Sequence, residues 1–426
     1  MGVDVNSSTV DAINEGRAPV VEPQLQELIA ACRPRLHATT DFGQAVLGSD
    51  ISFIIVPTPS DKSGGFSIRY AEQAAREIGR ALRHKQDYHL VALTSTVLPG
   101  STEYGILPAL EEESGKKCGR DFGLCYNPEF IALGSVIHDL LNPDFVLIGE
   151  SDERAGAMLE QWYQGYCDNH PPVARMNLVN AELAKISVNT FVTMKITFAN
   201  LLAAICEELP GADVDTVSAA LGLDSRIGRR YLTGGLGYGG PCFPRDNQAL
   251  AHMAQTVGAP TGLAESTDRM NQALLARQLE RVHALLRPGM RVGILGLAYK
   301  PNTNVIEDSQ GLALAQSLSE NGNVVAVYDP LAMDNARSVL KDRVQYMNSG
   351  MECIRNSDVV VITTPAEEFR ALEAGDFPRR QNKIIVLDCW RILASALRDC
   401  AWVDYCALGV GSKPSQATRA LARAAR

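Results

Sequence analysis

Short apolar runs alternate with amphipathic stretches between Ser52 and about Leu178. The runs are rich in Val, Ile, Leu and Phe and are bounded by turn residues, which predicts β-strands. The stretches Ser67–Arg83 and Thr102–Glu113 between them have the apolar spacing of helices. Strands that alternate with helices predict a parallel, doubly wound sheet. The expected strands are Ser52–Val56, Leu90–Thr94, Gly123–Tyr126 and Phe145–Ile148.

A long helix and a second alternating region follow. The segment Asn180–Glu208 contains no Pro or Gly, and its apolar residues recur at helical spacing. After Pro288-Gly289 a new series of strands begins, with a helix near Leu312–Glu320. The expected strands here are Arg291–Leu295, one that ends at Asp329, Asp358–Thr363 and Lys383–Asp388.

The predicted fold class is therefore α/β, with two Rossmann-like doubly wound domains joined by a long-helix central domain. We expect a cofactor domain at 1–178, a central helical domain at 179–283 that carries dimer contacts and the reactive cysteine, and a second α/β domain at 284–411. The alanine- and arginine-rich segment 412–426 is expected to be a frayed, solvated helix.

Composition narrows the class of protein. Hydrophobic residues make up 46% of the 426 residues and charged residues 21%, which is typical of globular proteins. A net charge of −9 argues against a nucleic-acid partner. No apolar run has bilayer-spanning length and no signal pattern opens the chain, so we expect a cytoplasmic protein without a membrane partner. The ten cysteines form no CxxC pair or Cys/His cluster, so neither a metal site nor a disulfide framework is indicated.

The first residues resemble the second half of a dinucleotide-binding βαβ unit. Met1–Val5 is expected to be a short strand, and Ser7-Ser8 to cap the following helix. In such units an acid at the end of the second strand binds the adenosine ribose, which makes Asp4 the candidate. The first strand and its glycine-rich turn do not precede it. We therefore expect the natural protein to begin upstream, and this truncated form to have two unpaired strand edges and weak NAD binding.

Three loops rich in Pro, Ser and Thr directly follow predicted strands. Prolines often punctuate strand ends, so one such loop says little. Ligands of open α/β sheets bind outside the carboxyl ends of the strands, however, and three such loops favour a ligand edge. The loops are Val56–Ser60, Ser95–Gly100 and Asn127–Phe130.

The sharpest local signal is the glycine-rich segment 234–240, which is followed by Pro241 and Cys242. Five glycines among seven residues indicate close approach of the backbone to another group. A cysteine beside such a loop can be presented to a ligand, and Arg245 nearby favours the thiolate. Most cysteines are instead buried and inert, as expected for Cys206, Cys353 and Cys389.

Lys185 and Asn189 are four residues apart on the long helix and so share one face. Such a pair is usually solvated. Two donors, one of them cationic, are nevertheless suited to stabilising an oxyanion.

Together these residues resemble the UDP-glucose/GDP-mannose dehydrogenase family over nearly the whole chain. Seven motifs occur in the family's order, and this order carries the resemblance although each motif alone is weak. They are Val56–Pro59, Ser95–Val97, Asn127–Phe130, Ala181–Lys185 with Asn189, Arg226–Gly228, Gly239–Phe243 with Asp246, and Gly296–Pro301.

The resemblance implies a four-electron oxidation of a nucleotide-sugar, with a UDP-hexose favoured, by two NAD molecules in turn. Cys242 forms a thiohemiacetal and then a thioester with C6 of the sugar. Lys185 and Asn189 stabilise oxyanions, while Asp246, Glu129 and Thr96 position water and handle protons. The residues implied for the cofactor are Asp4, Val56, Pro57, Thr58, Thr96 and Arg245. Those implied for the substrate are Glu129, Lys185, Asn189, Arg226, Tyr231, Gly235, Gly239, Lys300 and Arg391. The resemblance also implies a homodimer, which we expect to form through the long helix, with Arg226 reaching the substrate across its interface.

The chain departs from the family pattern at positions near the cofactor. Leu133 replaces a second glutamate, Thr9 a basic residue and Glu307 an arginine, whereas Arg245 keeps the charge of a lysine. Two alternatives therefore stay open. One is a non-catalytic nucleotide-sugar-binding protein with weakened NAD binding, and the other is a two-electron alcohol dehydrogenase, in which Cys242 has no task. The motifs do not specify the nucleotide or the sugar.

Overall fold

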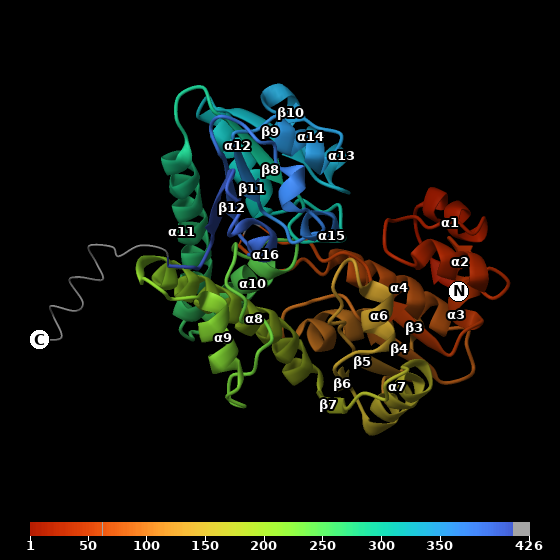
Figure 1. The fold of residues 1–426 in the computed structure, drawn as a ribbon. Helices are drawn as coiled ribbons and strands as arrows, with labels where there is room; N and C mark the ends of the chain where they lie inside the picture. The colour runs from red at the N-terminus through yellow and green to blue at the C-terminus, as the bar shows by residue number, and fades with distance from the viewer. Residues whose placement is uncertain (62, 412–426) are drawn as a thin grey trace, which may run out of the picture. The chain divides into compact units, whose positions relative to one another are not determined.

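The computed structural model describes residues 1–61 and 63–411 and forms two compact units. Unit 1 consists of Met1–Val188 with Gln248–Pro260, and unit 2 of Asn189–Asn247 with the chain from Thr261 onward. The predicted tail helix at 412–426 lies outside the described residues. Figure 1 shows the succession of elements along the chain.

Unit 1 contains a five-stranded sheet with helices on both faces. The strand order is β3-β4-β5-β6-β7. Alternate residues of a strand face opposite sides, so Val91 and Leu93 pack with α4 and α5 while Leu90 and Ala92 pack with α7. The strands are β3 (Ile51–Ile54), β4 (His89–Leu93), β5 (Phe122–Tyr126), β6 (Val146–Glu150) and β7 (Val173–Asn177). The helices are α4 (Arg69–Leu82), a π-helical turn (Thr102–Ile106), α5 (Leu107–Ser114), α6 (Val136–Leu141) and α7 (Glu153–Tyr166).

The expected strands of this sheet are confirmed within one or two residues, but the expectation of an all-parallel sheet is wrong. β6 runs antiparallel to β5, with Tyr126 opposite Gly149. The connection between them, residues 127–145, contains one short helix, α6.

The N-terminal residues form a separate parallel pair of strands, β1 (Gly2–Val3) and β2 (Ala38–Thr39). The helix that follows β1 is capped by Asn6, whose side chain accepts from Ser8 N at 3.0 Å, and not by Ser7-Ser8 as predicted. Among the described strands β1 pairs only with β2, and β3 pairs only with β4. The helices here are α1 (Ser7–Asn14), α2 (Leu25–Cys32) and α3 (Phe42–Leu47).

Unit 2 contains a six-stranded, wholly parallel sheet in the order β10-β9-β8-β11-β12-β13. This confirms the second α/β domain, although the sequence analysis missed β10 and β13 here, and β2 and β7 in unit 1. The strands are β8 (Arg291–Leu295), β9 (Val324–Tyr328), β10 (Gln345–Tyr346), β11 (Val359–Ile362), β12 (Ile384–Asp388) and β13 (Val403–Ala407). The helices are α12 (Gln310–Glu320), α13 (Met333–Leu340), α14 (Gly350–Arg355), α15 (Glu367–Arg370) and α16 (Ala394–Leu397), with short 3₁₀ turns at Lys341–Arg343 and Ala374–Asp376.

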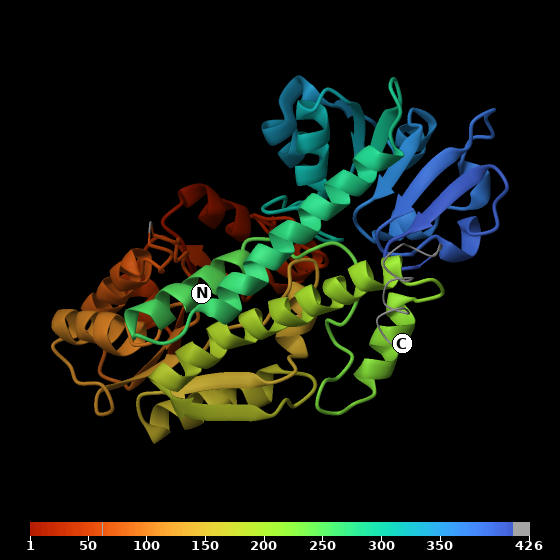
Figure 2. The ribbon, with the colours of Figure 1, turned by 90° about the vertical axis from the view of Figure 1, so that its left-hand side faces the viewer.

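Two long helices, α8 (Leu178–Glu208) and α11 (Gly262–Leu285), stand out in Figure 2. Near the end of α8, Glu207 pairs with Arg281 and with Arg277, the latter at 3.2 Å, and accepts from Gly409 N at 2.9 Å. These bonds fix the end of α8 to α11 and to the segment after β13. The remaining helices are α9 (Val214–Gly222) and α10 (Phe243–Thr256).

The 31-residue helix α8 contains an 18-residue stretch of mean hydropathy 1.4 and is long and apolar enough to cross a membrane by length and composition. This corrects the expectation that no apolar stretch of the chain is long enough to span a bilayer. A core helix of a soluble protein passes the same test. α8 also carries Glu182 and Lys185, both of which are buried in hydrogen-bonded contacts with unit 1 residues.

Candidate active site

The loops after β3 and β4, which belong to the predicted ligand edge, are hydrogen-bonded to each other. The Thr58 hydroxyl donates to the carbonyl of Thr96 at 2.6 Å, and the Ser95 hydroxyl donates to the carbonyl of Val56 at 2.6 Å. Because both strands end at this edge, Val56, Pro57, Thr58 and Thr96 lie together.

The third loop brings Glu129 and Lys185 together. Lys185 Nζ donates to the carbonyl of Glu129 and lies 4.4 Å from the centre of the Phe130 ring. The Tyr163 hydroxyl lies 3.0 Å from Glu129 Oε1 and 2.7 Å from Asn127 Oδ1. Burial raises the pKa of the Glu129 carboxyl, and the Tyr163 hydrogen bond and the Lys185 charge partly offset that rise. Glu129 is thus a half-buried carboxyl whose pKa is shifted by its surroundings, as the pKa values of acid–base residues often are.

Glu182 fixes the turn that follows the Thr96 loop. Its carboxylate accepts from Gly100 N at 2.5 Å, and from the backbone and hydroxyl of Thr102 at 2.8 and 2.6 Å. Burial raises the pKa of Glu182, and these hydrogen bonds oppose the rise. The motif Ala181–Lys185 therefore contributes a supporting carboxylate in addition to Lys185.

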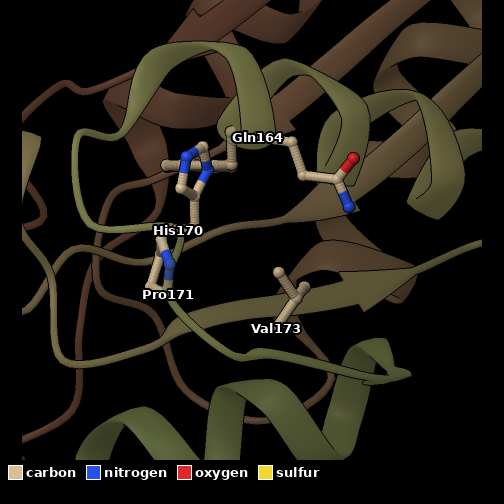
Figure 3. Close-up of a pocket in the computed structure, with 5 residues that line it drawn as sticks. Gln164, His170, Pro171 and Val173 are labelled. Atoms are coloured by element: carbon tan, nitrogen blue, oxygen red, sulfur yellow. The ribbon is translucent and has the colours of Figure 1, made fainter.

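A cavity of about 390 Å³ lies beside α7 (Figure 3). None of the predicted site residues lines it. Its wall includes the Tyr163 ring, whose hydroxyl reaches Glu129. The lining residues are Tyr163, Gln164, His170, Pro171 and Val173.

The residues around β1 fit a bound adenosine ribose. Asp4 follows the strand, and its Oδ1 accepts from Asn6 N at 2.8 Å. A carboxylate has four acceptor sites, so this bond leaves acceptor capacity for two ribose hydroxyls.

In unit 2, Cys242 directly precedes α10 and is exposed. Asp246, one turn further, is 1% exposed. Asn189 Nδ2 donates to Asp246 Oδ2 at 2.6 Å, and Arg245 lies 3.4 Å from Asp246 Oδ1. An exposed thiol thus lies one helical turn from a buried carboxylate that an amide orients.

The other cysteines behave as predicted. None of the ten cysteines, all of which lie in the described residues, forms a disulfide, and Cys206, Cys353 and Cys389 are buried. Burial raises the pKa of Cys353 to about 12 and also raises that of Cys389. A thiol that stays protonated is a poor nucleophile, so these three cysteines are inert.

The glycine-rich segment 234–240 is in close contact with groups of the protein itself. A Cβ on Gly235 would lie 2.6 Å from the Trp390 ring, and one on Gly240 would lie 2.6 Å from the Tyr299 ring. A Cβ on Gly239 would lie 2.8 Å from the carbonyl carbon of Asp308. The expected close approach of the backbone to another group is therefore confirmed, and the groups are side chains and backbone of unit 2.

Hydrogen bonds hold the same segment along its length. Asn200 Oδ1 accepts from Gly235 N at 2.8 Å, and Gly240 N donates to the carbonyl of Glu307 at 2.8 Å. Asn271 forms a reciprocal pair with the backbone of Tyr238 at 3.0 and 2.9 Å. The backbone before Cys242 is therefore fixed at both ends and in the middle.

Arg391 is hydrogen-bonded to the start of this segment. Its guanidinium bonds Asp215 at 2.7 and 3.0 Å, the carbonyl of Gly234 at 2.6 Å and the carbonyl of Leu408 at 2.9 Å. Its side chain is 6% exposed, and its φ of 59° is left-handed. In this structure Arg391 holds the glycine-rich segment.

Two other predicted substrate residues lie on the surface. Arg226 is exposed and pairs with Asp224 at 2.6 Å. Tyr231 is also exposed, with a left-handed φ of 64°.

Lys300 lines a cavity of about 240 Å³ at the carboxyl ends of β8, β9 and β11. β8 lies between β9 and β11, so the strand order reverses there, which is where open α/β sheets bind ligands. Asp329 follows β9, and its carboxylate accepts from four backbone amides, those of Leu297, Ala298, Leu331 and Ala332. Besides Ala298, Lys300 and Asp329, the lining residues are Pro301, Asn302, Thr303, Pro330, Leu331, Thr364, Ala366, Glu367 and Glu368.

The sequence analysis did not identify several residues that take part in these contacts. Tyr163, Asn200, Asn271 and Trp390 each act through a contact with a distant part of the chain, and no local pattern marks them. Among the described residues, no group of three His, Cys, Asp or Glu side chains is arranged to hold a metal ion.

A doubly wound sheet, a second parallel sheet with a cavity at its carboxyl edge and an exposed cysteine beside a glycine-rich segment are typical of a nucleotide-dependent dehydrogenase. Residues 1–167 match the NAD binding domain of the UDP-glucose/GDP-mannose dehydrogenase family, 179–273 its central domain and 293–395 its UDP binding domain. The chain belongs to this family and is an NAD-dependent nucleotide-sugar 6-dehydrogenase.

Individual relatives agree with this assignment. The chain is 36% identical to a UDP-glucose 6-dehydrogenase of Haloferax volcanii, covering 91% of this chain and 90% of the relative. It is 34% identical to a GDP-mannose 6-dehydrogenase of Pseudomonas aeruginosa, covering 87% and 86%. The structure is similar to that of a UDP-glucose dehydrogenase from Pyrobaculum islandicum, with TM-score 0.85, 35% identity and coverage of 96% and 92%.

Proposed function

We propose that this enzyme oxidises the C6 alcohol of a UDP-hexose to the uronic acid in a four-electron reaction through a thioester on Cys242. One observation carries the proposal. Cys242 is exposed directly before α10, one turn from the buried Asp246 to which Asn189 donates, while Cys206, Cys353 and Cys389 are buried. A thioester intermediate needs an accessible thiol with polar groups beside it.

The proposed chemistry balances. One primary alcohol, two NAD⁺ and one water give one carboxylate, two NADH and three protons. Bound NAD⁺ supplies the hydride acceptor in both oxidations. After the first oxidation gives the aldehyde, the Cys242 sulfur adds to C6 and forms a thiohemiacetal. The second oxidation converts it to a thioester, and water then cleaves the C–S bond and returns the thiol.

The remaining roles follow from residue chemistry. Lys185 and Asn189 donate to the oxygen that becomes negative at C6. Glu129, Thr96 and Asp246 orient water and take up protons. Asp4 accepts from the ribose of NAD, with Val56, Pro57, Thr58 and Arg245 around the cofactor. Lys300 contacts the diphosphate of the substrate, as do Arg226 and Tyr231 from their exposed loop. Arg391 stays a predicted substrate contact, although its guanidinium already bonds Asp215 and Gly234.

The number of NADH molecules formed per sugar tests this proposal. Purified enzyme with limiting UDP-glucose and excess NAD⁺ is expected to give two NADH and one uronic acid, measured by absorbance and mass spectrometry. GDP-mannose serves as the competing substrate. One NADH and a released aldehyde would contradict the thioester route and leave a two-electron dehydrogenase.

Replacing Tyr163 by phenylalanine is expected to move the acidic limb of the pH–rate profile to higher pH. The Tyr163 hydroxyl stabilises the Glu129 carboxylate and so lowers its pKa against the effect of burial. Without this hydroxyl the pKa of Glu129 rises, and the base form is lost at a higher pH. The measurement is kcat from pH 5 to 9.

Tyr166→Phe is the matched control for this measurement. Tyr166 lies on the same helix and stacks on Trp162, and its hydroxyl has no hydrogen-bond partner in the described part of the chain. We expect its profile to follow that of the wild type. If the acidic limbs of the pH–rate profiles coincide in the wild type, Tyr163→Phe and Tyr166→Phe, the Tyr163 hydroxyl does not set the pKa of the catalytic base.

We also propose a homodimer that forms through α8. Phe191, Phe198 and Ile205 are 59%, 46% and 45% exposed and recur every seven residues, so they share one face of the helix. Exposed apolar stripes of this kind are typical of helix–helix interfaces. The double variant Phe191→Glu/Phe198→Glu is expected to be monomeric at micromolar concentration in light scattering, because it places charges on that face.

Val257→Glu provides the control, since Val257 is 72% exposed outside α8. It should leave the mass of the wild-type particle unchanged. A wild-type monomer at micromolar concentration, or a double variant that stays dimeric, would refute the interface.

A further inference from the structure

The segment that lines the Lys300 cavity also contacts the glycine-rich segment before Cys242. Ala298 and Lys300 line the cavity, and Tyr299 lies between them in the chain. The Tyr299 ring covers Gly240, where a Cβ would be 2.6 Å from it. Lys300 Nζ lies 5.7 Å from the centre of the same ring. One aromatic side chain therefore joins the cavity wall to a glycine two residues before the thiol.

A second aromatic residue makes the corresponding contact at the other end of the segment. Thr364 lines the cavity, and the carbonyl of its neighbour Thr363 accepts from Trp390 Nε1 at 2.8 Å. The Trp390 ring covers Gly235, where a Cβ would be 2.6 Å from it. Both ends of the glycine-rich segment thus rest on aromatic rings that are connected to the cavity wall.

Backbone hydrogen bonds make the first of these connections stiff. Tyr299 N donates to the carbonyl of Val305 at 3.1 Å, which closes the turn 299–305 on itself. Gly240 N donates to the carbonyl of Glu307 at 2.8 Å, directly after this turn. The Tyr299 ring and these backbone bonds therefore connect the Lys300 turn to Gly240.

The cavity suits the nucleoside diphosphate part of the substrate. The Lys300 ammonium provides a cation for the diphosphate, and Glu367 and Glu368 provide acceptors for hydroxyl and N–H groups. A ligand changes a conformational equilibrium only by its differential affinity for the two states. A phosphate that draws Lys300 toward itself favours the arrangement in which Tyr299 is pressed against Gly240.

We propose that a nucleoside diphosphate bound beside Lys300 further stabilises the arrangement of the glycine-rich segment seen in this structure and so restricts the Cys242 thiol, with Tyr299 and Trp390 as positioning residues. This inference rests on the proposed function of Cys242 as the nucleophile. The thiol is then held most firmly when the nucleotide half of the substrate is bound. The sugar reaches an ordered nucleophile, and the thiol of the free enzyme is less well placed for chemistry.

The test uses UDP alone, which lacks the sugar and so permits no turnover. The rate of Cys242 alkylation by iodoacetamide is followed by peptide mass spectrometry with and without saturating UDP and in the absence of NAD. In the wild type UDP is expected to slow alkylation at least threefold, because the ordered segment restricts the thiol. Trp390 fluorescence should change over the same UDP concentrations.

Variants separate the Tyr299 contact from binding and folding. Tyr299→Leu should keep UDP binding by calorimetry but lose the effect on alkylation, whereas Tyr299→Phe, which keeps the ring, should retain it. Tyr346→Leu removes a tyrosine that bonds Lys341 elsewhere in unit 2, and it should behave as the wild type. Circular dichroism confirms that each variant is folded.

An unchanged or faster alkylation rate with UDP bound to the wild type would overturn the inference, as would a full UDP effect in Tyr299→Leu. Absence of UDP binding would overturn it as well. None of these results alters the count of NADH per sugar, so failure of the coupling is distinct from failure of the thioester mechanism.

Discussion

Cys242→Ser is expected to abolish formation of the uronic acid while leaving the fold and UDP binding nearly unchanged. The Cys242 side chain is exposed, and serine replaces its thiol by a hydroxyl of similar size, so little packing is lost. A serine hydroxyl is a much weaker nucleophile than a thiolate, and only the thiol gives the thioester that water can cleave. The measurement is uronic acid formed per enzyme per minute, together with calorimetric UDP binding.

Cys400→Ser is the matched control, because Cys400 is a free, half-buried cysteine of the same unit and no role is proposed for it. It should retain wild-type turnover. If Cys242→Ser keeps a tenth or more of the activity, the lost barrier stabilisation is about 1.4 kcal/mol or less. Such a small loss would exclude a covalent intermediate on this residue.

Gly239→Ala is expected to impair both stability and turnover although it adds one methyl group. The new Cβ would lie 2.8 Å from the carbonyl carbon of Asp308 and closer still to its oxygen, and both are backbone atoms that cannot rotate away. Overpacking of this kind costs about 1–3 kcal/mol. The segment before Cys242 must also shift, and a displacement of about 1 Å at a nucleophile can lower the rate roughly 100-fold. Urea unfolding and kcat measure the two effects.

Gly262→Ala is the control substitution in the same unit. No heavy atom lies within 4 Å of a Cβ at Gly262, and the residue begins helix α11. We expect wild-type turnover and unchanged or slightly higher stability, since alanine favours helices over glycine. If Gly239→Ala keeps wild-type stability and turnover, the backbone at Asp308 can shift to make room for the methyl group with little loss of free energy of unfolding.

Local patterns in the sequence determined the secondary structure well. The strand Arg291–Leu295 agrees with the prediction at both ends, and the helix predicted from Asn180 begins two residues earlier at Leu178. Periodicity suffices there because a buried strand or a long helix repeats its apolar positions several times. β10, with 2 residues, gives no such repeat and was missed.

The candidate residues were identified by residue type and order, but their contacts were not. Sequence reasoning selected Lys185 as an oxyanion ligand, and the structure adds its bond to the carbonyl of Glu129. Arg391 was selected as a substrate contact, and the structure shows it bonded to Asp215, 176 residues away. Contacts at such separation depend on how the elements pack, which a local pattern does not encode.

The sequence by itself determined the α/β class, the family motifs and the one cysteine set apart by its glycine-rich flank. Those features are local, because strand and helix periods and the conformational freedom of glycine act over a few residues. Only the tertiary structure decided that β6 runs antiparallel to β5 and that Tyr163 reaches Glu129. It alone decided that the glycines before Cys242 make room for Trp390, Asp308 and Tyr299. A glycine in the sequence indicates that another group lies close to the backbone there. Which group that is depends on the distant segments that pack against the glycine in the folded protein.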